Sequence, residues 1–227
     1  MSSTSIALVS SAVPAHAMEG TGLGNENVGQ HVTIPRVKLL QKMSDEVDKY
    51  NSKYIAGAEP GHFFNSLTGQ NYGEELYVIN LLFRNEYVVW RNREAGGGIL
   101  GSFSSMQDAQ AAIKSQQKPE DYTVTDTHSH VLLIKNPATG ELDKTPVIMD
   151  FSSSKMRISR SWNSMIGIKG GNRFSGLWKL KSVSVQNKTG AQYMNLESEF
   201  VGWATDEDYQ YAKSVYSQHA NLGNLAD

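Results

Sequence analysis

The sequence lacks cysteine altogether, although it has 227 residues. This absence excludes disulfides, thiolate nucleophiles and cysteine-based zinc or iron–sulfur sites, and it is typical of a reducing cytoplasm. Long apolar runs are missing too. No segment approaches the roughly 18 apolar residues that a membrane-spanning helix needs. The first residues also have neither the positive segment nor the apolar run of a signal peptide. We therefore expect a soluble protein without a membrane partner.

Acidic residues are missing from one long stretch, residues 151–196, although the whole chain has 23 acidic and 21 basic residues. Eight basic residues lie in this acid-free stretch: Lys155, Arg157, Arg160, Lys169, Arg173, Lys179, Lys181 and Lys188. Four aromatic residues lie between them: Trp162, Phe174, Trp178 and Tyr193. Such a segment offers positive potential to a polyanion and flat rings on which bases stack. A basic surface that serves only solubility is the alternative.

The composition divides the chain into three parts. Residues 1–33 are rich in Ser, Ala and Gly without periodicity, which predicts a mobile N-terminal arm. Residues 34–203 carry the β signals and the acid-free stretch, and are expected to form one folded domain. Residues 204–227 are predicted to form a C-terminal helix, with Thr205 and Asp208 as its capping box, and a short tail.

Runs of β-branched and aromatic residues separated by turn residues dominate the chain from Glu75 onward. A hairpin is predicted around residues 84–86, a second across the turn 136–140 and a third across the turn 187–190. A helix over 106–115 is expected to pack beside the sheet. The pattern predicts a mainly β, antiparallel fold with peripheral helices and a C-terminal helix.

The segment SSSKMRISRSW is compatible with two geometries. As a strand, it places Trp162 and Arg160 on one face and Lys155 and Arg157 on the other. As a helix, it buries an apolar stripe that includes Trp162, while Arg157 and Arg160 project from the opposite side. The helix is favoured because Met165–Ile166 completes the stripe, and it makes Trp162 a core residue rather than a stacking platform. Both geometries expose the arginines.

The strand expected from residue 177 presents lysines on one face. Period two places Lys179 and Lys181 together and Trp178 opposite them. The two lysines are predicted to contact phosphates, whereas Trp178 either packs in the core or stacks on a base. In the preceding loop, two glycines allow close backbone approach, and Lys169 and Arg173 are predicted to hold phosphate there. An ordinary hairpin loop is the alternative for that segment.

A second aromatic and basic group is predicted on an earlier strand, where Tyr87, Arg91 and Arg93 share one parity. His128 and His130 share a face at a spacing that suits a metal, but no third ligand lies nearby, so an exposed pair is the preferred interpretation. We therefore predict no metal and no cofactor. No catalytic motif organises the serines and carboxylates, so the protein is expected not to be an enzyme.

Three segments resemble the single-stranded-DNA-binding proteins of tailed bacteriophages. They are IPRVKLLQ after the expected arm, PVIMDFSSSKMRISRSWNS, and the strand LWKLKSVSV with the hairpin beyond it. The resemblance covers residues 34–203 and implies an OB-like (oligonucleotide-binding) β-barrel. It also implies DNA-backbone contacts from Lys155, Arg157, Arg160, Lys179 and Lys181. Many of these proteins end in a long acidic tail, whereas residues 221–227 contain one acid.

The resemblance implies a function as well. The protein would bind and protect single-stranded DNA without strong sequence preference during phage DNA replication and recombination, in the cytoplasm of the infected bacterial host. Phage replication proteins are its implied partners, and exposed sheet edges are compatible with a homodimer. The alternative is a phage virion or host-interaction protein whose basic face binds an acidic protein partner.

Overall fold

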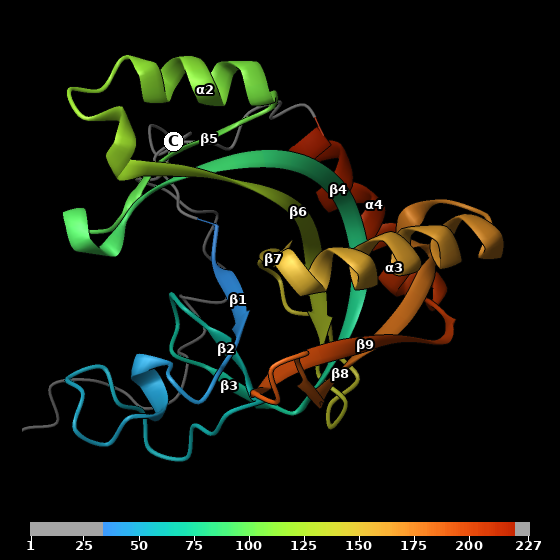
Figure 1. Cartoon of the computed structure of the whole chain (residues 1–227). Coiled ribbons are helices and arrows are strands. Elements are labelled where there is room, and N and C mark those ends of the chain that lie inside the picture. The colour runs from blue at the N-terminus through green and yellow to red at the C-terminus, as the bar shows by residue number, and fades with distance from the viewer. Residues whose placement is uncertain (1–33, 221–227) are drawn as a thin grey trace, which may run out of the picture. The chain divides into compact units, whose positions relative to one another are not determined.

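The computed structural model describes residues 34–220, so the expected N-terminal arm and the last residues of the tail lie outside the described residues. Nine strands of the described region form one sheet. They are β1 (Arg36–Leu39), β2 (Phe63–Asn65), β3 (Asn71–Gly73), β4 (Glu75–Arg91), β5 (Ile99–Phe103), β6 (Tyr122–Lys135), β7 (Val147–Ser152), β8 (Gly176–Gln186) and β9 (Gln192–Trp203). The α-helices within residues 34–220 are α2 (Met106–Lys114), α3 (Met156–Lys169) and α4 (Asp206–Ala220). Figure 1 shows the sheet curled into a half-barrel, with α3 inside the curl and α4 behind it.

The sheet is mixed rather than purely antiparallel. Its strands follow the order β3-β2-β1-β7-β6-β4-β8-β9, and β5 pairs with β4 off this path. β1 runs parallel to β7, with Arg36 opposite Ile148, whereas the other pairings are antiparallel. The expected antiparallel barrel therefore needs correction at this pair. β1 and β7 are separated in the chain by β2 to β6, so no hairpin turn joins them directly and dictates that they run in opposite directions.

β4 runs without interruption from Glu75 to Arg91, so the hairpin predicted at residues 84–86 is wrong. β6 pairs with β4 along almost its whole length, from Tyr77 opposite Lys135 to Arg91 opposite Tyr122. The polar residues that suggested a turn lie in a partly exposed stretch of this strand. They include no glycine of the kind that a two-residue hairpin turn favours.

The other predicted elements are confirmed. The turns at 136–140 and 187–190 connect the hairpins β6–β7 and β8–β9. Ser105 caps α2 by accepting the N–H of Asp108. Thr205 Oγ1 accepts the N–H of Asp208 at 3.2 Å at the start of α4. The segment with two candidate geometries is the helix α3, which follows β7 through a short 3-10 turn over Ser153–Lys155.

Two apolar clusters cover the two faces of the sheet. Within the curl, α3 closes the first cluster with Trp162 and Ile166, which pack with sheet residues that include Phe63, Phe151 and Trp178. The second cluster lies on the outer face, where sheet residues meet the helix α4. Its buried members are Ile79, Leu81, Val131, Leu133, Ile148, Phe174, Ala212 and Val215. The sheet is thus packed between two helices, an arrangement that buries both of its faces.

The side chain of Gln41, which lies just after β1, bonds to the backbone of β9, the last strand in the sheet order. We call this junction the seam. The Gln41 Nε2 donates to the carbonyl oxygen of Met194 at 2.9 Å, and the Met194 N–H donates to Gln41 Oε1 at 2.9 Å. The amide therefore occupies the place of a strand partner at β9. Gly61 lies at this seam with φ +97°, and a Cβ there would come within 2.6 Å of Met194 Cε and 2.8 Å of Ser182 Oγ. The positive φ therefore favours glycine at this position, and a larger residue would also displace the Met194 and Ser182 side chains.

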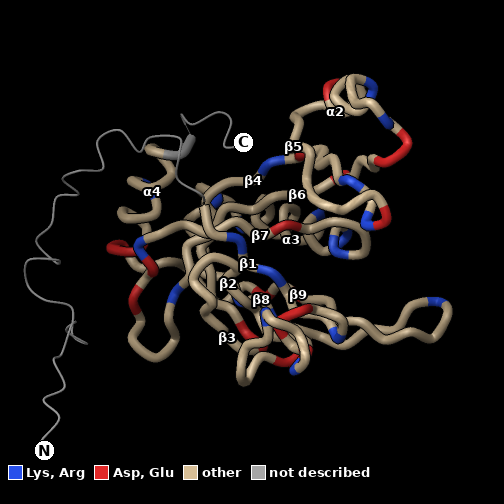
Figure 2. The backbone as a smooth tube through the Cα atoms, turned by 90° about the vertical axis from the view of Figure 1, so that its left-hand side faces the viewer, with Lys and Arg blue, Asp and Glu red and all other residues tan. Residues whose placement is uncertain are grey.

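Two parts of the sheet project beyond the half-barrel. We call residues 86–127 the arm, since β5 and α2 pack there on the distal parts of β4 and β6. We call residues 183–195 the hairpin tip, where β8 and β9 continue to their turn. Figure 1 and Figure 2 both place α3 between the arm and the β8–β9 hairpin.

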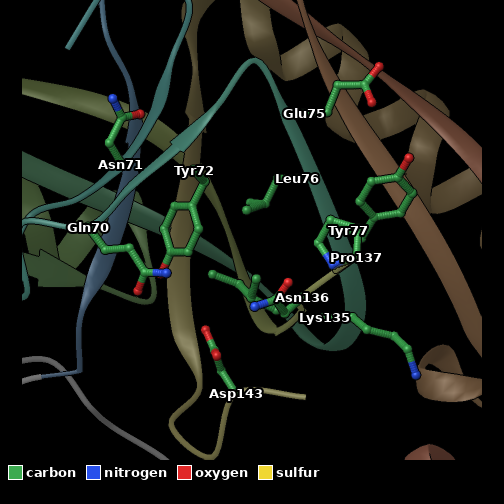
Figure 3. A pocket seen from close by; sticks show the side chains of 11 residues that line it. Gln70, Asn71, Tyr72, Glu75, Leu76, Tyr77, Lys135, Asn136, Pro137 and Asp143 are labelled. Atoms are coloured by element: carbon green, nitrogen blue, oxygen red, sulfur yellow. The ribbon is translucent and has the colours of Figure 1, made fainter. Parts of the chain in front are cut away.

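A cavity of about 190 Å³ lies near the start of β4, at the opposite end of that strand from the arm. Residues of β3, of β6 and of the β6–β7 turn also line it, and Figure 3 shows the side chains of Tyr72, Tyr77 and Asp143 around it. None of the helices in residues 34–220 is long and apolar enough to cross a membrane.

Candidate nucleic-acid interface

The helix α3 is held in the curl by one buried face. Met156, Ser159, Trp162 and Ile166 recur at the spacing of three to four residues that puts side chains on one side of a helix. Trp162 is fully buried and stacks on His130 with ring centroids 4.8 Å apart. This packing orients the helix, so its remaining sides face solvent.

Three cations of α3 are exposed: Arg157, Arg160 and Lys169. Within the described residues, none of them forms an ion pair. Arg157 and Arg160 lie about 60° apart around the helix axis, and Lys169 is about 18 Å from Arg157 along it. The Lys169 ammonium lies 4.4 Å from the ring centroid of Phe200 on β9. The helix therefore presents separated positive charges that no carboxylate of the described region neutralises.

Lys155 and Arg173 are partly buried beside this surface. Burial lowers the pKa of the Lys155 ammonium, and the charge of Asp150 acts in the opposite direction. Arg173 Nη1 donates to Asn163 Oδ1 of α3 at 2.9 Å, and its guanidinium lies 5.6 Å from the Phe83 ring centroid. Burial lowers the pKa of Arg173, which nevertheless stays protonated because a guanidinium titrates far above neutral pH. Both residues add positive potential, but Arg173 also fastens the loop to the helix.

The lysines of β8 have acidic neighbours on the two adjacent strands, β4 and β9, and these acidic residues lie outside the acid-free stretch of the sequence. Lys179 Nζ lies 2.9 Å from Glu199 Oε2 and 3.9 Å from Glu75 Oε1. The hydrogen bond to Glu199 raises the pKa of Lys179. Lys181 is exposed and lies opposite Glu75 on β4 and Glu197 on β9. This face of the sheet is of mixed charge, so a phosphate there would compete with three carboxylates.

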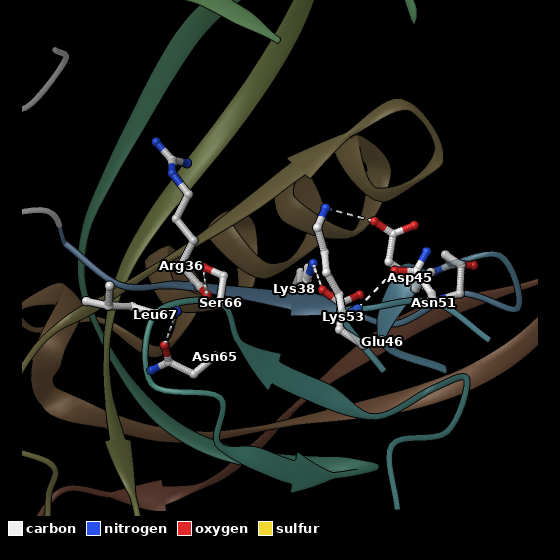
Figure 4. Close-up of polar contacts among 11 residues, drawn as sticks. Arg36, Lys38, Asp45, Glu46, Asn51, Lys53, Asn65, Ser66 and Leu67 are labelled. Atoms are coloured by element: carbon white, nitrogen blue, oxygen red, sulfur yellow. Dashed lines mark hydrogen bonds and ion pairs between the residues drawn. The ribbon is translucent and has the colours of Figure 1, made fainter. Parts of the chain in front are cut away.

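The cations of β1 are neutralised in the same way. Arg36 is paired with Asp150, and Lys38 is paired with Glu46. Figure 4 shows the contact of Lys38 with Glu46 beside that of Lys53 with Asp45. The segment IPRVKLLQ, one of the three segments behind the resemblance, therefore does not present free charge at these two positions.

The aromatic residues interleaved with these cations are mostly core residues. Trp162, Phe174 and Trp178 are buried, so the structure resolves the alternatives for Trp178 and Trp162 in favour of the core. The Trp178 ring therefore has no open face on which a base could stack. The two exposed tryptophans lie elsewhere: Trp203 is 57% exposed at the end of β9, and Trp90 is 45% exposed on the arm.

Trp203 is the functional candidate that sequence reasoning missed. Its ring packs edge-on against Phe200 with centroids 5.3 Å apart, and Phe200 carries the Lys169 ammonium on its face. Trp203 shares its strand parity with Glu197 and Glu199, both exposed, and this alternation was the signal that could have placed it on the surface.

Tyr87, Arg91 and Arg93 lie on the arm. Tyr87 pairs with Asp126 of β6 and Phe103 of β5, and Arg91 pairs with Tyr122. Arg93 begins the 3-10 turn that follows β4. The eleven predicted binding residues therefore divide between α3 with its adjoining turns, the two faces of β8, where Trp178 is buried opposite Lys179 and Lys181, and the arm.

His128 and His130 form a buried network instead of the exposed pair that we expected. His128 Nδ1 lies 2.8 Å and His130 Nε2 lies 2.7 Å from the Oγ of Ser159, which is fully buried on α3. Asn80 Nδ2 donates to His130 Nδ1 at 2.9 Å. The His130 Nε2–H then donates to Ser159, and the Ser159 hydroxyl donates to His128 Nδ1. Both imidazoles are thereby neutral and oriented.

This network positions α3 and offers no open site. Burial lowers the pKa of His130 to about 3, and the charges of Arg173 and His128 act in the same direction. Burial also lowers the pKa of His128. No group of three metal-ligating side chains occurs within the described residues. The Ser159 hydroxyl has no access to a substrate, since the residue is completely covered.

Comparison with known proteins places the chain in a phage family. Residues 4–222 match the model of a family described as Pam3 phage gp34-like protein. No curated protein and no solved structure gives a significant match. The family match supports the expectation of a phage protein, but it does not identify the single-stranded-DNA-binding family. Since nearly the whole sequence is matched, the chain belongs to the Pam3 phage gp34-like family.

Proposed function

We propose that this protein binds single-stranded DNA through the exposed side of α3 and acts without catalysis in phage DNA replication and recombination. The observation that carries the proposal is the set of three exposed cations, Arg157, Arg160 and Lys169, that have no acidic partner in the described region. Phosphate is the natural counter-ion for such a helix, because each contact releases condensed cations from the nucleic acid.

The strand connectivity supports an OB-like barrel as part of this proposal. If the inserted β5 is left out, the five strands β4, β6, β7, β8 and β9 stand in the sheet in the order β7-β6-β4-β8-β9. The first of these strands in the chain, β4, therefore pairs with the second, β6, and with the fourth, β8. The helix α3 connects the third to the fourth. In OB-folds the loops between strands one and two and between strands four and five contact oligonucleotides. Those loops correspond here to the arm and the hairpin tip, which lie on either side of α3 (Figure 2).

Exposed rings would supply the remaining affinity. Trp203 lies at the Lys169 end of α3, so a base stacked on its indole would have its phosphate within reach of a cation. Stacking on one aromatic side chain contributes about 1–3 kcal/mol and tolerates any base. A site built from separated cations and one or two rings therefore matches binding without strong sequence preference.

The test is a fluorescence-anisotropy titration of a labelled oligonucleotide at several salt concentrations, with single-stranded and duplex competitors. Three phosphate contacts predict that log affinity falls with log salt at a slope of about −2. Arg157→Ala with Arg160→Ala should flatten this slope by about 1.4. The matched control, Lys179→Ala with Lys181→Ala, removes the same charge from the face that carries Glu75, Glu197 and Glu199, and should leave the slope nearly unchanged.

Three results would contradict the proposal. Flattening by the β8 variant and not by the α3 variant would move the interface to β8. Preference for the duplex competitor would exclude a single-strand binder. Absence of oligonucleotide binding at low salt, together with binding of an acidic protein partner that the α3 variant loses, would favour the alternative of a virion or host-interaction protein.

A further inference from the structure

The cavity beside Tyr72 has the size of a side-chain site. Its volume of about 190 Å³ is below the roughly 300–1,000 Å³ of pockets for drug-sized ligands. Figure 3 shows Gln70, Tyr72 and Asp143 converging on one side, while Tyr77 and Pro137 lie on the other. The opening is therefore lined by rings, an amide and a carboxylate, and it has room for a single protruding group.

The cavity contains a negative charge without a counter-ion. The partly buried Asp143 carboxylate has no hydrogen-bond or ion-pair partner among the described residues. Lys135 also lines the cavity, but its ammonium is paired with Asp208 of α4, and in Figure 3 it points away from Asp143. Glu75 adds a second carboxylate to the lining. Burial raises the pKa of Asp143, as expected for an uncompensated carboxylate.

We propose that this cavity binds the guanidinium group of an arginine side chain presented by a partner protein. A guanidinium suits it better than an ammonium, because a planar cation stacks on a tyrosine ring and its five N–H donors can reach several acceptors together. The acceptors here are the Asp143 carboxylate, the Gln70 amide oxygen and the Tyr72 hydroxyl oxygen. Tyr77 and Tyr72 supply the rings.

The sequence argues that the cation comes from another molecule. Residues 1–33 and 221–227 contain neither lysine nor arginine. Free arginine is a poor candidate, because its α-carboxylate would add a negative charge to a cavity that Asp143 and Glu75 already line. An arginine within a polypeptide carries no such charge. The site is independent of the proposed DNA interface, since its lining shares no residue with α3.

The experiment is an NMR titration of the whole protein with N-acetyl-L-arginine amide, following the amide signals of residues 70–77 and the Asp143 carboxyl carbon. Saturable shifts are expected. Binding should weaken at least tenfold with N-acetyl-L-citrulline amide, which has the same shape without the charge. Asp143→Asn should give a similar loss, whereas Asp126→Asn, which removes an exposed carboxylate on the arm, should bind as the original protein does.

Circular dichroism and oligonucleotide affinity of Asp143→Asn should be unchanged, so a loss of the arginine signal would not reflect misfolding. Equal binding of the citrulline amide, or full binding by Asp143→Asn, would overturn the proposal. So would absence of saturation at millimolar arginine amide. Equal or tighter binding of free L-arginine would overturn its assignment to a protein side chain.

Discussion

At the scale of single residues, Ser159 connects the helix that carries the proposed interface to the sheet beneath it. Its hydroxyl bonds to His128 and His130 at 2.8 and 2.7 Å, and the residue is completely buried. Its position was visible in the sequence, since Ser159 falls three residues after Met156 and three before Trp162, within the apolar stripe of α3. A polar residue on a buried stripe predicts a buried partner, but the sequence did not show that the partners are two histidines on β6.

Replacing Ser159 tests this connection. Ser159→Ala should destabilise the protein by about 1–3 kcal/mol, because it leaves buried groups of two imidazoles unsatisfied. Ser161→Ala is the matched control, since this exposed serine lies on the same helix and should change stability by less than about 0.5 kcal/mol. The free energies of unfolding from urea titrations measure both. Equal stability of the two variants would contradict a structural role for the network.

At the scale of elements, strand pairing rearranges charge that looks segregated in the sequence. Residues 151–196 contain no acidic residue, and in α3 the cations are free in consequence, since Arg157 and Arg160 form no ion pair with any residue of 34–220. The lysines of β8 are not free in the same way, because β9 and β4 bring Glu199 and Glu75 to Lys179. Local periodicity predicted α3, α4 and two hairpins, since each depends on residues close in sequence. The parallel pairing of β1 and the uninterrupted β4 depend on distant partners, which periodicity does not identify.

The seam between the first and last strands is the element-scale feature most open to test. Gln41→Met keeps the approximate shape of the side chain but removes both hydrogen bonds to Met194. We expect a loss of about 1–3 kcal/mol, since each of the two bonds contributes about 0.5–1.5 kcal/mol. Hydrogen exchange should also quicken at β9, because the Met194 N–H loses its acceptor. Lys42→Met, at the exposed neighbouring position, is the control. Unaltered exchange in Gln41→Met would show that the amide does not hold the strands together.

At the scale of the whole molecule, the half-barrel is closed around histidines that must stay neutral. His130 is surrounded by the rings of Phe83, Phe151 and Trp162, and its Nδ1 already accepts the Asn80 amide N–H. If His130 Nδ1 were protonated, its N–H would point at the N–H of the Asn80 amide, so two hydrogen-bond donors would face each other. The charges of Arg173 and His128 oppose protonation further. The stability of the whole fold is thereby linked to the titration of this one core residue.

Because folding lowers the pKa of His130, the free energy of unfolding should fall as the pH drops below about 6.5, before the carboxylates begin to titrate near pH 4. The pKa of His130 is about 3 in the folded protein, compared with about 6.5 when unfolded, so below pH 6.5 the unfolded chain binds the proton that the fold excludes. Stability should be complete above pH 6.5, lower by about 2 kcal/mol at pH 5, and lower still toward pH 3. His128 acts in the same direction, because burial lowers its pKa as well. Urea unfolding between pH 7.5 and pH 4.5 measures the slope. His130→Asn should flatten it even though the variant is less stable at neutral pH, whereas His62→Asn, at a partly exposed position, should retain it. An equally steep slope in His130→Asn would show that the acid sensitivity arises elsewhere.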